Sequence, residues 1–134
     1  MVYKSKDLPL RVPPCTYNQQ DFMQCLIFNF FIMELLTDTL RKRFQEIGRQ
    51  DETTNPIIVT KFFNPTGAGT WYITEFYPED QCVYGYVTGL GYDEWGYISL
   101  LEIKAYKSPL GIGIERDISF EEQRFLEVKE IHGE

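Results

Sequence analysis

The stretch between Ile57 and Thr88 constrains the fold more than any other part of the chain. It contains three runs rich in β-branched and aromatic residues, separated by the turn-forming clusters NPTGAG (64–69) and PEDQ (78–81). Runs of this composition between such clusters are typical of neighbouring antiparallel strands. The pattern therefore predicts a three-stranded antiparallel meander.

The two turns also predict a register for the meander. If Phe63 pairs with Thr70 and Tyr77 pairs with Cys82, strict alternation distributes the side chains over two faces. One face then carries Ile58, Phe62, Trp71, Ile73, Glu75, Tyr77, Tyr84 and Tyr86, and the other carries Val59, Lys61, Phe63, Tyr72, Thr74, Phe76, Val83 and Val87. Neither set has the composition of a solvent-exposed surface, so we expect both faces to be covered at least in part.

A helix is expected before the meander. Leu36, Leu40, Phe44 and Ile47 follow helical spacing. Thr37 is suited to the N-cap, and Gly48 ends the helix. Residues 50–55 read as a solvated linker to the first strand.

Shorter elements are expected after the meander. The pattern predicts a strand at 96–98, a helix from the capping box at Ser99 to about Tyr106, and a strand over 110–117. A second capping box at Ser119 predicts a helix to Phe125, and the acidic tail 126–134 is expected to fray. The predicted fold class is α+β, a mainly antiparallel sheet packed with an N-terminal helix and one or two short helices.

The first 32 residues differ from the rest of the chain. Pro9, Pro13 and Pro14 interrupt any early element, and an apolar run follows at 26–32. We predict an N-terminal extension over residues 1–32, either disordered or the product of a misassigned start, and a single globular domain over 33–134. The alternative is an arm whose apolar run docks on the domain.

Composition excludes several classes of function. The net charge of −7 opposes general electrostatic binding of nucleic acid and favours a partner protein with a basic or apolar surface. The three cysteines suit a reducing cytoplasm, and no apolar run is long enough to span a membrane. Because His132 is the only histidine, a Ser-His-Asp triad, a Cys-His pair and a histidine-ligated zinc site are nearly excluded.

Motifs spread along the chain resemble one bacterial family. In order they are Lys61-Phe62-Phe63, Thr70-Trp71, Thr74-Glu75, Gly89-Leu90-Gly91, Glu94, Gly96-Tyr97-Ile98-Ser99-Leu100, Glu102, Pro109-Leu110-Gly111 and Glu115-Arg116-Asp117. This series is similar to the family catalogued as domain of unknown function 2958, over about residues 33–125. The resemblance implies no established activity. It implies an association with plasmids and integrative elements, near genes for antirestriction or conjugation.

The chain departs from the family pattern at one position. Members typically carry an acidic residue just before the Leu-Gly loop, where this chain has Val87-Thr88-Gly89. If that acid has a catalytic role in the family, the role does not carry over to this chain by resemblance.

Carboxylates are the first candidate site residues. They are Glu75, Asp93, Glu94, Glu115 and Asp117, accompanied by the cations Lys61 and Arg116. Oxygen ligands of this kind can hold Mg²⁺ for phosphoryl chemistry, with the lysine stabilising developing negative charge. The alternative is a structural ion-pair network in which Arg116 pairs with Glu75 or Glu94.

Aromatic residues are the second candidate set. We single out Trp71, Tyr84, Tyr86, Tyr92 and Trp95, together with Arg116, as a surface for binding another protein. The alternative is that these aromatic side chains form the core.

The favoured function is therefore an acidic accessory protein of a mobile element that acts by protein binding and needs no cofactor. The alternative is a small metal-dependent enzyme acting on a phosphoester, with Mg²⁺ and catalytic candidates Glu75, Glu115, Asp117 and Lys61.

Overall fold

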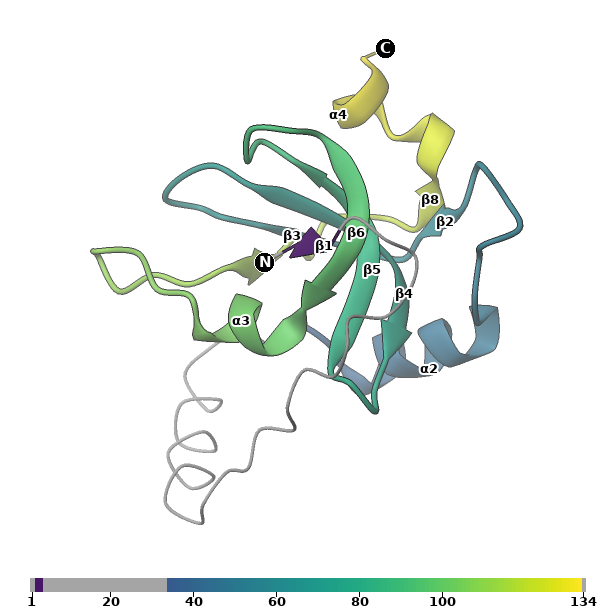
Figure 1. Cartoon of the computed structure of the whole chain (residues 1–134), viewed down its shortest axis with the longest axis horizontal. Coiled ribbons are helices and arrows are strands. Elements are labelled where there is room, and N and C mark those ends of the chain that lie inside the picture. Colours follow the sequence, from purple (N-terminus) through teal and green to yellow (C-terminus); the bar gives the residue numbers. More distant parts are fainter. Residues whose placement is uncertain (1, 4–33, 134) are drawn as a thin grey trace.

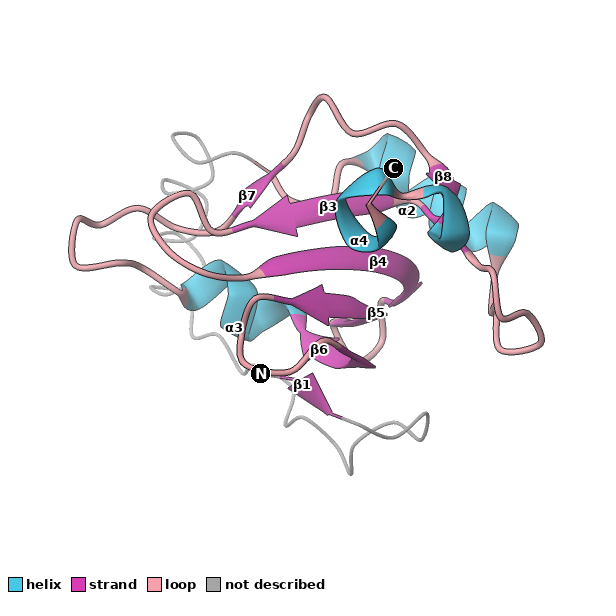
Figure 2. Ribbon diagram, turned by 90° about the horizontal axis from the view of Figure 1, so that it is seen from above, coloured by secondary structure: helices cyan, strands magenta, loops and turns pink. Residues whose placement is uncertain are grey.

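A six-stranded antiparallel sheet forms the centre of the structure, a computed structural model that describes residues 2–3 and 34–133. Figure 1 shows the whole chain, and Figure 2 labels the six strands in their order, β1-β6-β5-β4-β3-β7. The strands are β1 (Val2–Tyr3), β3 (Thr60–Phe63), β4 (Thr70–Tyr77), β5 (Cys82–Thr88), β6 (Glu94–Ser99) and β7 (Glu115–Arg116). The predicted α+β class is confirmed, and β3, β4 and β5 are the predicted meander.

The predicted turn registers are correct, but the assignment of side chains to faces is wrong. Phe63 pairs with Thr70, and Tyr77 pairs with Cys82. Between them, Ile73 pairs with Gly85 while Glu75 pairs with Tyr84, so Thr74 is an extra residue in β4. This β-bulge reverses the alternation halfway along the strand.

The two faces of the sheet consequently differ from the prediction. On the core face, Trp71 and Ile73 lie with Val59, Phe62, Phe76, Val83 and Val87. On the opposite face, which we call the aromatic face, Ile58, Tyr72, Tyr77, Tyr84 and Tyr86 lie with Trp95 and Tyr97. Both faces are covered, as the sequence predicts.

Two capped helices cover the core face. Helix α2 (Asp38–Ile47) begins with the Thr37 hydroxyl accepting from the Leu40 amide, and it ends at Gly48, whose φ is 70°. Helix α3 (Leu100–Ala105) begins with the Ser99 hydroxyl accepting from the Glu102 amide. Both predicted caps are confirmed, and the helices bury Phe44, Leu100 and Ile103 against the sheet, together with Leu36, which precedes α2.

The chain after residue 109 differs from the prediction. The strand is limited to β7, and Leu110 is 78% exposed in a turn. The predicted helix over 119–125 is absent. In its place β8 (Gln123–Arg124) pairs with β2 (Ile57–Ile58), followed by the 3₁₀ helix η1 (Phe125–Glu127) and α4 (Lys129–His132). At the predicted helix start, Asp117 instead accepts from the Ser119 N–H at 2.9 Å and from the Phe120 N–H at 3.2 Å, and residues 123–124 pair with β2.

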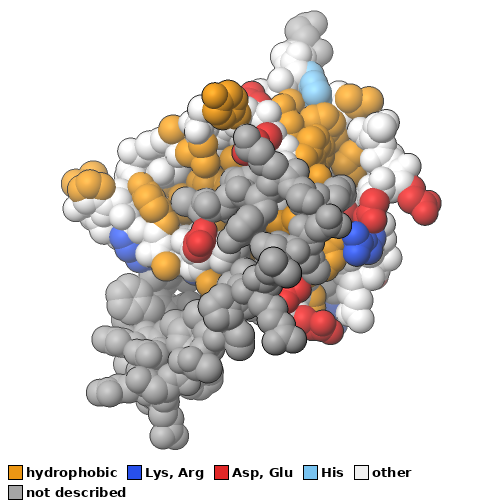
Figure 3. Space-filling view, in the orientation of Figure 1, with side chains coloured by type: hydrophobic (Ala, Val, Ile, Leu, Met, Phe, Trp, Pro, Cys, Tyr) orange, Lys and Arg blue, Asp and Glu red, His pale blue; other side chains and the backbone are white. Residues whose placement is uncertain are grey.

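The C-terminal segment (residues 120–132) covers the aromatic face rather than fraying. Figure 1 shows α4 above the sheet, on the side opposite α2 and α3, which lie below it. Phe125 packs edge-on to Tyr86 at 5.0 Å between ring centroids, and Val128 has no solvent exposure. In Figure 3 hydrophobic side chains gather at the upper end of the molecule, where this segment lies.

Val128 tests whether this segment is docked. We expect Val128→Ala to lower the free energy of unfolding by about 2 kcal/mol, because it leaves a cavity at a fully buried site. Leu126→Ala is the matched control, since Leu126 is 59% exposed, and should stay within about 0.5 kcal/mol. Urea denaturation followed by tryptophan fluorescence measures both. Equal, small effects would show that the segment frays in solution.

Much of the predicted N-terminal extension lies outside the described residues. Within it the structure describes only Val2 and Tyr3, whose backbones pair with Ile98 and Tyr97 of β6. The apolar run 26–32 and the cysteines Cys15 and Cys25 also lie outside the described residues.

Candidate functional site

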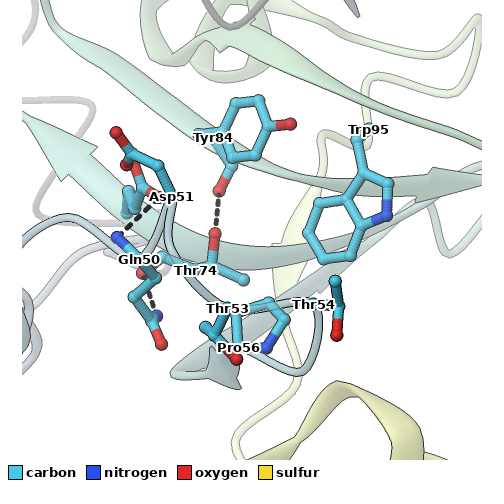
Figure 4. Close-up of a pocket in the computed structure, with 9 residues that line it drawn as sticks. Gln50, Asp51, Thr53, Thr54, Pro56, Thr74, Tyr84 and Trp95 are labelled. Atoms are coloured by element: carbon cyan, nitrogen blue, oxygen red, sulfur yellow. Dashed lines mark hydrogen bonds between the residues drawn. The ribbon is translucent and has the colours of Figure 1, made fainter.

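A cleft opens on the aromatic face, between the sheet and the loop that joins α2 to β2 (Figure 4). Its volume is about 250 Å³. The loop supplies one wall and strands β4, β5 and β6 supply the other. The lining residues are Gln50, Asp51, Thr53, Thr54 and Pro56 from the loop, and Thr74, Glu75, Tyr84 and Trp95 from the sheet.

Gln50 fixes the loop onto the bulge of β4. Its side-chain amide donates to the carbonyls of Ile57 at 2.9 Å and Thr74 at 3.0 Å, and its amide oxygen accepts from the Ile57 N–H at 2.8 Å. The Thr74 hydroxyl in turn donates to the Tyr84 carbonyl at 3.1 Å. Thr74, the extra residue in β4, therefore bonds the loop through its carbonyl and bonds β5 through its hydroxyl.

One of the residues that line the cleft is a buried carboxylate. Glu75 is 3% exposed and accepts a hydrogen bond from the Gln50 N–H at 3.0 Å and another from the Tyr77 hydroxyl. Hydrogen bonds of this kind are what allow a charge to be buried. Burial, and then the bond to Glu75, raise the pKa of Tyr77, so this phenol stays a hydrogen-bond donor.

The sheet side of the cleft is aromatic. The rings of Tyr84 and Trp95 are nearly parallel, at 14° with 5.8 Å between centroids, and Tyr97 packs on Tyr84 at 4.9 Å. Burial raises the pKa of Tyr84 to about 12, helped by the negative charges of Glu75 and Asp51. The same charges that disfavour a phenolate here favour a cation.

A guanidinium of the chain lies beside the cleft. Arg49 Nε donates to both carboxylate oxygens of Asp51, at 3.2 and 3.1 Å. The Arg49 guanidinium carbon is also 5.8 Å from the centroid of the Tyr77 ring. The hydrogen bond to Asp51 raises the pKa of Arg49 further above its ordinary value.

The C-terminal segment holds the cleft loop from the other side. The Phe125 N–H donates to the Pro56 carbonyl at 2.8 Å, and the Leu126 N–H donates to Asn55 Oδ1 at 2.8 Å. The Phe125 ring contacts Trp95 with 4.8 Å between centroids. Loop, aromatic wall and C-terminal segment therefore form one connected structure.

The structure separates the predicted aromatic candidates. Tyr84 and Trp95 meet in the cleft, whereas Trp71 belongs to the core and is 1% exposed. Tyr86 lies beneath Phe125, and Tyr92 is 77% exposed in the β5–β6 loop. Of the predicted surface, Trp95 therefore adjoins both Tyr84 and Tyr86, at 5.8 and 5.2 Å between ring centroids, and only the first two of these three rings line the cleft.

The predicted pairing of Arg116 is wrong. Its guanidinium donates to the backbone carbonyl of Glu34, and no described carboxylate forms an ion pair with it. Strand β7 lies at the sheet edge, next to β3, so Arg116 faces the chain preceding α2.

The carboxylate candidates are dispersed. Asp117 pairs with Lys61 at 3.6 Å, and Lys61 also pairs with Glu130 of α4 at 3.4 Å. Asp93 accepts from the Gly89 N–H at 3.4 Å. Glu94 begins β6 and Glu115 begins β7. Within residues 2–3 and 34–133, no three histidine, cysteine, aspartate or glutamate side chains gather as a metal ion would require.

Sequence reasoning did not single out the loop residues of the cleft. Gln50, Asp51, Thr53 and Thr54 lie in a polar stretch that resembles an exposed linker. Gln50 is only 9% exposed, but its partners are backbone carbonyls at positions that only the bulge defines. No local sequence signal marks it.

The tyrosines predict a loss of stability at alkaline pH. Because the pKa of Tyr84 rises from 10.0 in the unfolded chain to about 12 in the folded protein, the protonated form is favoured by folding. The stability that Tyr84 contributes is fully present below its unfolded-state pKa of 10.0. It is lost as the pH rises from about 10 toward 12. Urea midpoints between about pH 8 and 11 should therefore fall, and less steeply for Tyr84→Phe. Tyr92→Phe, which changes an exposed ring, is the control. If the urea midpoint of Tyr84→Phe falls with pH as steeply as that of wild type, Tyr84 does not contribute to the alkaline loss of stability.

Comparison with known proteins gives one match. The model of the family described as "Protein of unknown function (DUF2958)" matches residues 32–129. No curated protein and no solved structure matches the chain. None of the helices in the described part of the chain is long and apolar enough to cross a membrane. Since the match covers most of the chain, in agreement with the resemblance in the motifs, the protein belongs to the DUF2958 family.

Proposed function

We propose that this protein is a non-enzymatic accessory module that binds another protein, with the cleft receiving one basic side chain of that partner. The observation that carries the proposal is the combination of a buried carboxylate and an aromatic wall in a cleft of about 250 Å³. Sites for small molecules commonly measure about 300–1,000 Å³. A cleft below that range suits a single side chain better than a metabolite.

Overall charge favours the same class of partner. The chain carries a net charge of −7, and complementary charge accelerates association and excludes wrong partners. An acidic protein repels nucleic-acid phosphates, so direct nucleic-acid binding is not proposed. The partner is a protein with a basic or apolar surface.

The biological setting of the proposal comes from the family resemblance. We place the protein in the bacterial cytoplasm as a product of a plasmid or other mobile element, with a role in antirestriction or conjugation. The low cysteine count agrees with a reducing compartment.

A charge-reversal pair tests the proposal. Tagged wild type, Asp51→Lys and Glu79→Lys are used to capture proteins from a bacterial host lysate, followed by mass spectrometry. Asp51 lines the cleft, whereas Glu79 is exposed in the β4–β5 turn, so both variants change the net charge equally. We expect wild type and Glu79→Lys to capture the same partner and Asp51→Lys to lose it.

Two results would contradict the proposal. Undiminished capture by Asp51→Lys would remove the cleft from the interaction. A saturable rise in melting temperature with millimolar Mg²⁺, lost in Glu115→Gln and Asp117→Asn, would favour the metal-dependent enzyme.

A further inference from the structure

The shape and chemistry of the cleft distinguish between the two common basic side chains. Two nearly parallel aromatic rings, Tyr84 and Trp95, present a flat wall to it. A guanidinium is planar and weakly hydrated, so it stacks on such a wall at a lower desolvation cost than an ammonium. The wall therefore favours arginine over lysine.

The oxygens around the cleft are distributed in a way that suits a fork of donors. Asp51, Thr53 and Thr54 lie on the loop, with Thr54 beside Trp95, and Glu75 and Thr74 lie on β4. A guanidinium offers five N–H donors in one plane, whereas an ammonium offers three around a point. A guanidinium can therefore donate to more of the oxygens around the cleft at the same time than an ammonium can.

The chain itself shows that this neighbourhood accepts a guanidinium. Arg49 bonds Asp51 through Nε and places its charge over the Tyr77 ring, just outside the set of residues that line the cleft. That arrangement uses Asp51, which itself lines the cleft and whose two carboxylate oxygens already accept from Arg49. It combines the same two contacts, a carboxylate and an aromatic face, that the cleft offers to a second cation.

We propose that the cleft is a recognition site for an arginine side chain of the partner protein, with Trp95 and Tyr84 as the stacking wall and Glu75 and Asp51 as the charge. This inference rests on the proposed function, because it names the group by which the partner is recognised. Lysine and uncharged side chains of similar length are the excluded ligands.

Small blocked amino acids test the inference directly. The probes are N-acetyl-arginine methylamide, its lysine counterpart, and the citrulline counterpart, which keeps the shape of arginine without its charge. Binding to the full chain is followed by two-dimensional ¹H–¹⁵N NMR. The chain has two tryptophans, so the indole N–H region holds two signals, one from the cleft and one from the buried core residue Trp71.

The arginine probe should move the Trp95 indole signal and leave the Trp71 signal in place. From the binding free energy per atom typical of ligands of this size, we expect a dissociation constant of about 1 mM. The lysine probe should bind about threefold or more weakly, and the citrulline probe about tenfold or more weakly. Raising the salt concentration should weaken the binding of the arginine probe to the protein.

Variants keep the test independent of folding. Asp51→Asn should weaken the arginine probe, whereas Glu79→Gln, which removes the same charge from the β4–β5 turn, should leave its binding unchanged. Glu75→Gln is not used alone, because the buried hydrogen bonds of Glu75 support the fold. The spectrum of each variant reports whether it is folded.

The results separate this inference from the function on which it rests. Equal binding of citrulline, equal or tighter binding of lysine, or no Trp95 shift up to about 50 mM arginine probe, well above the expected constant, would overturn arginine recognition. If the Asp51→Lys protein still fails to capture the partner in that case, protein binding through the cleft stands and only the named side chain is wrong. If partner capture is also unaffected by Asp51→Lys, both proposals fail.

Discussion

Gly85→Ala should be among the most damaging single substitutions in the sheet, lowering the free energy of unfolding by about 3 kcal/mol or more. A methyl group at Gly85 would lie 2.1 Å from the Tyr72 carbonyl oxygen and 3.0 Å from the Ile73 Cα. Both neighbours are backbone atoms in the middle of β4, so neither can move without breaking the pairing of β4 with β5. Chemical denaturation measures the loss, and failure to fold is the extreme of the same outcome.

Gly67→Ala is the matched control. A methyl group there meets only the Asn64 side-chain amide, at 3.2 Å, and not backbone, so a shift of a few tenths of an ångström relieves the contact. The expected change is within about 0.5 kcal/mol. Equal stability of the two variants would show that β4 and β5 approach less closely than described.

Trp71→Ala should lower the free energy of unfolding by about 3–5 kcal/mol. Trp71 is 1% exposed on the core face, where it pairs with Phe62 on one side and Val87 on the other. Its indole nitrogen has no hydrogen-bond acceptor among the described residues, so its contribution comes from packing. Trp71→Phe should therefore lose less than Trp71→Ala.

Tyr92→Ala is the control for a large aromatic residue outside the core, since Tyr92 is 77% exposed. Its stability should stay within about 0.5 kcal/mol of wild type. If Trp71→Ala keeps normal stability and loses partner binding instead, Trp71 is an interface residue and the core assignment is wrong.

Local signals in the sequence were sufficient for the elements that depend on neighbouring residues. The caps at Thr37 and Ser99 and the turns that pair Phe63 with Thr70 follow from side chains within three or four positions. Such signals are strong because the partner groups are already close in the chain.

The C-terminal segment could not be predicted in the same way. Its structure depends on contacts between distant residues, such as the bond of the Phe125 N–H to the Pro56 carbonyl. The capping box that begins at Ser119 predicts a helix, but the backbone of residues 123–124 pairs with β2 instead. Local propensity gave way to tertiary contacts.

The candidate site was predicted in part. Glu75, Tyr84 and Trp95 were singled out by residue type, and they do meet in one cleft. Strict alternation correctly places Glu75 on the face of Tyr84, but it wrongly places Trp71 and Ile73 there as well. One extra residue, Thr74, changes the parity of β4, and a Thr in a strand gives no sign that it is unpaired.

The bulge also has a consequence for how chain length can vary in this family. Because Thr74 is the supernumerary residue of β4, its loss would restore strict alternation while leaving Trp71 and Phe76 on the core face and Glu75 in the cleft. Loss of Tyr72 would instead bring Ile73 opposite Tyr86 on the aromatic face and Thr74 opposite Gly85 on the core face. A relative one residue shorter at this point can therefore keep the same sheet, and the gap in its alignment belongs opposite Thr74.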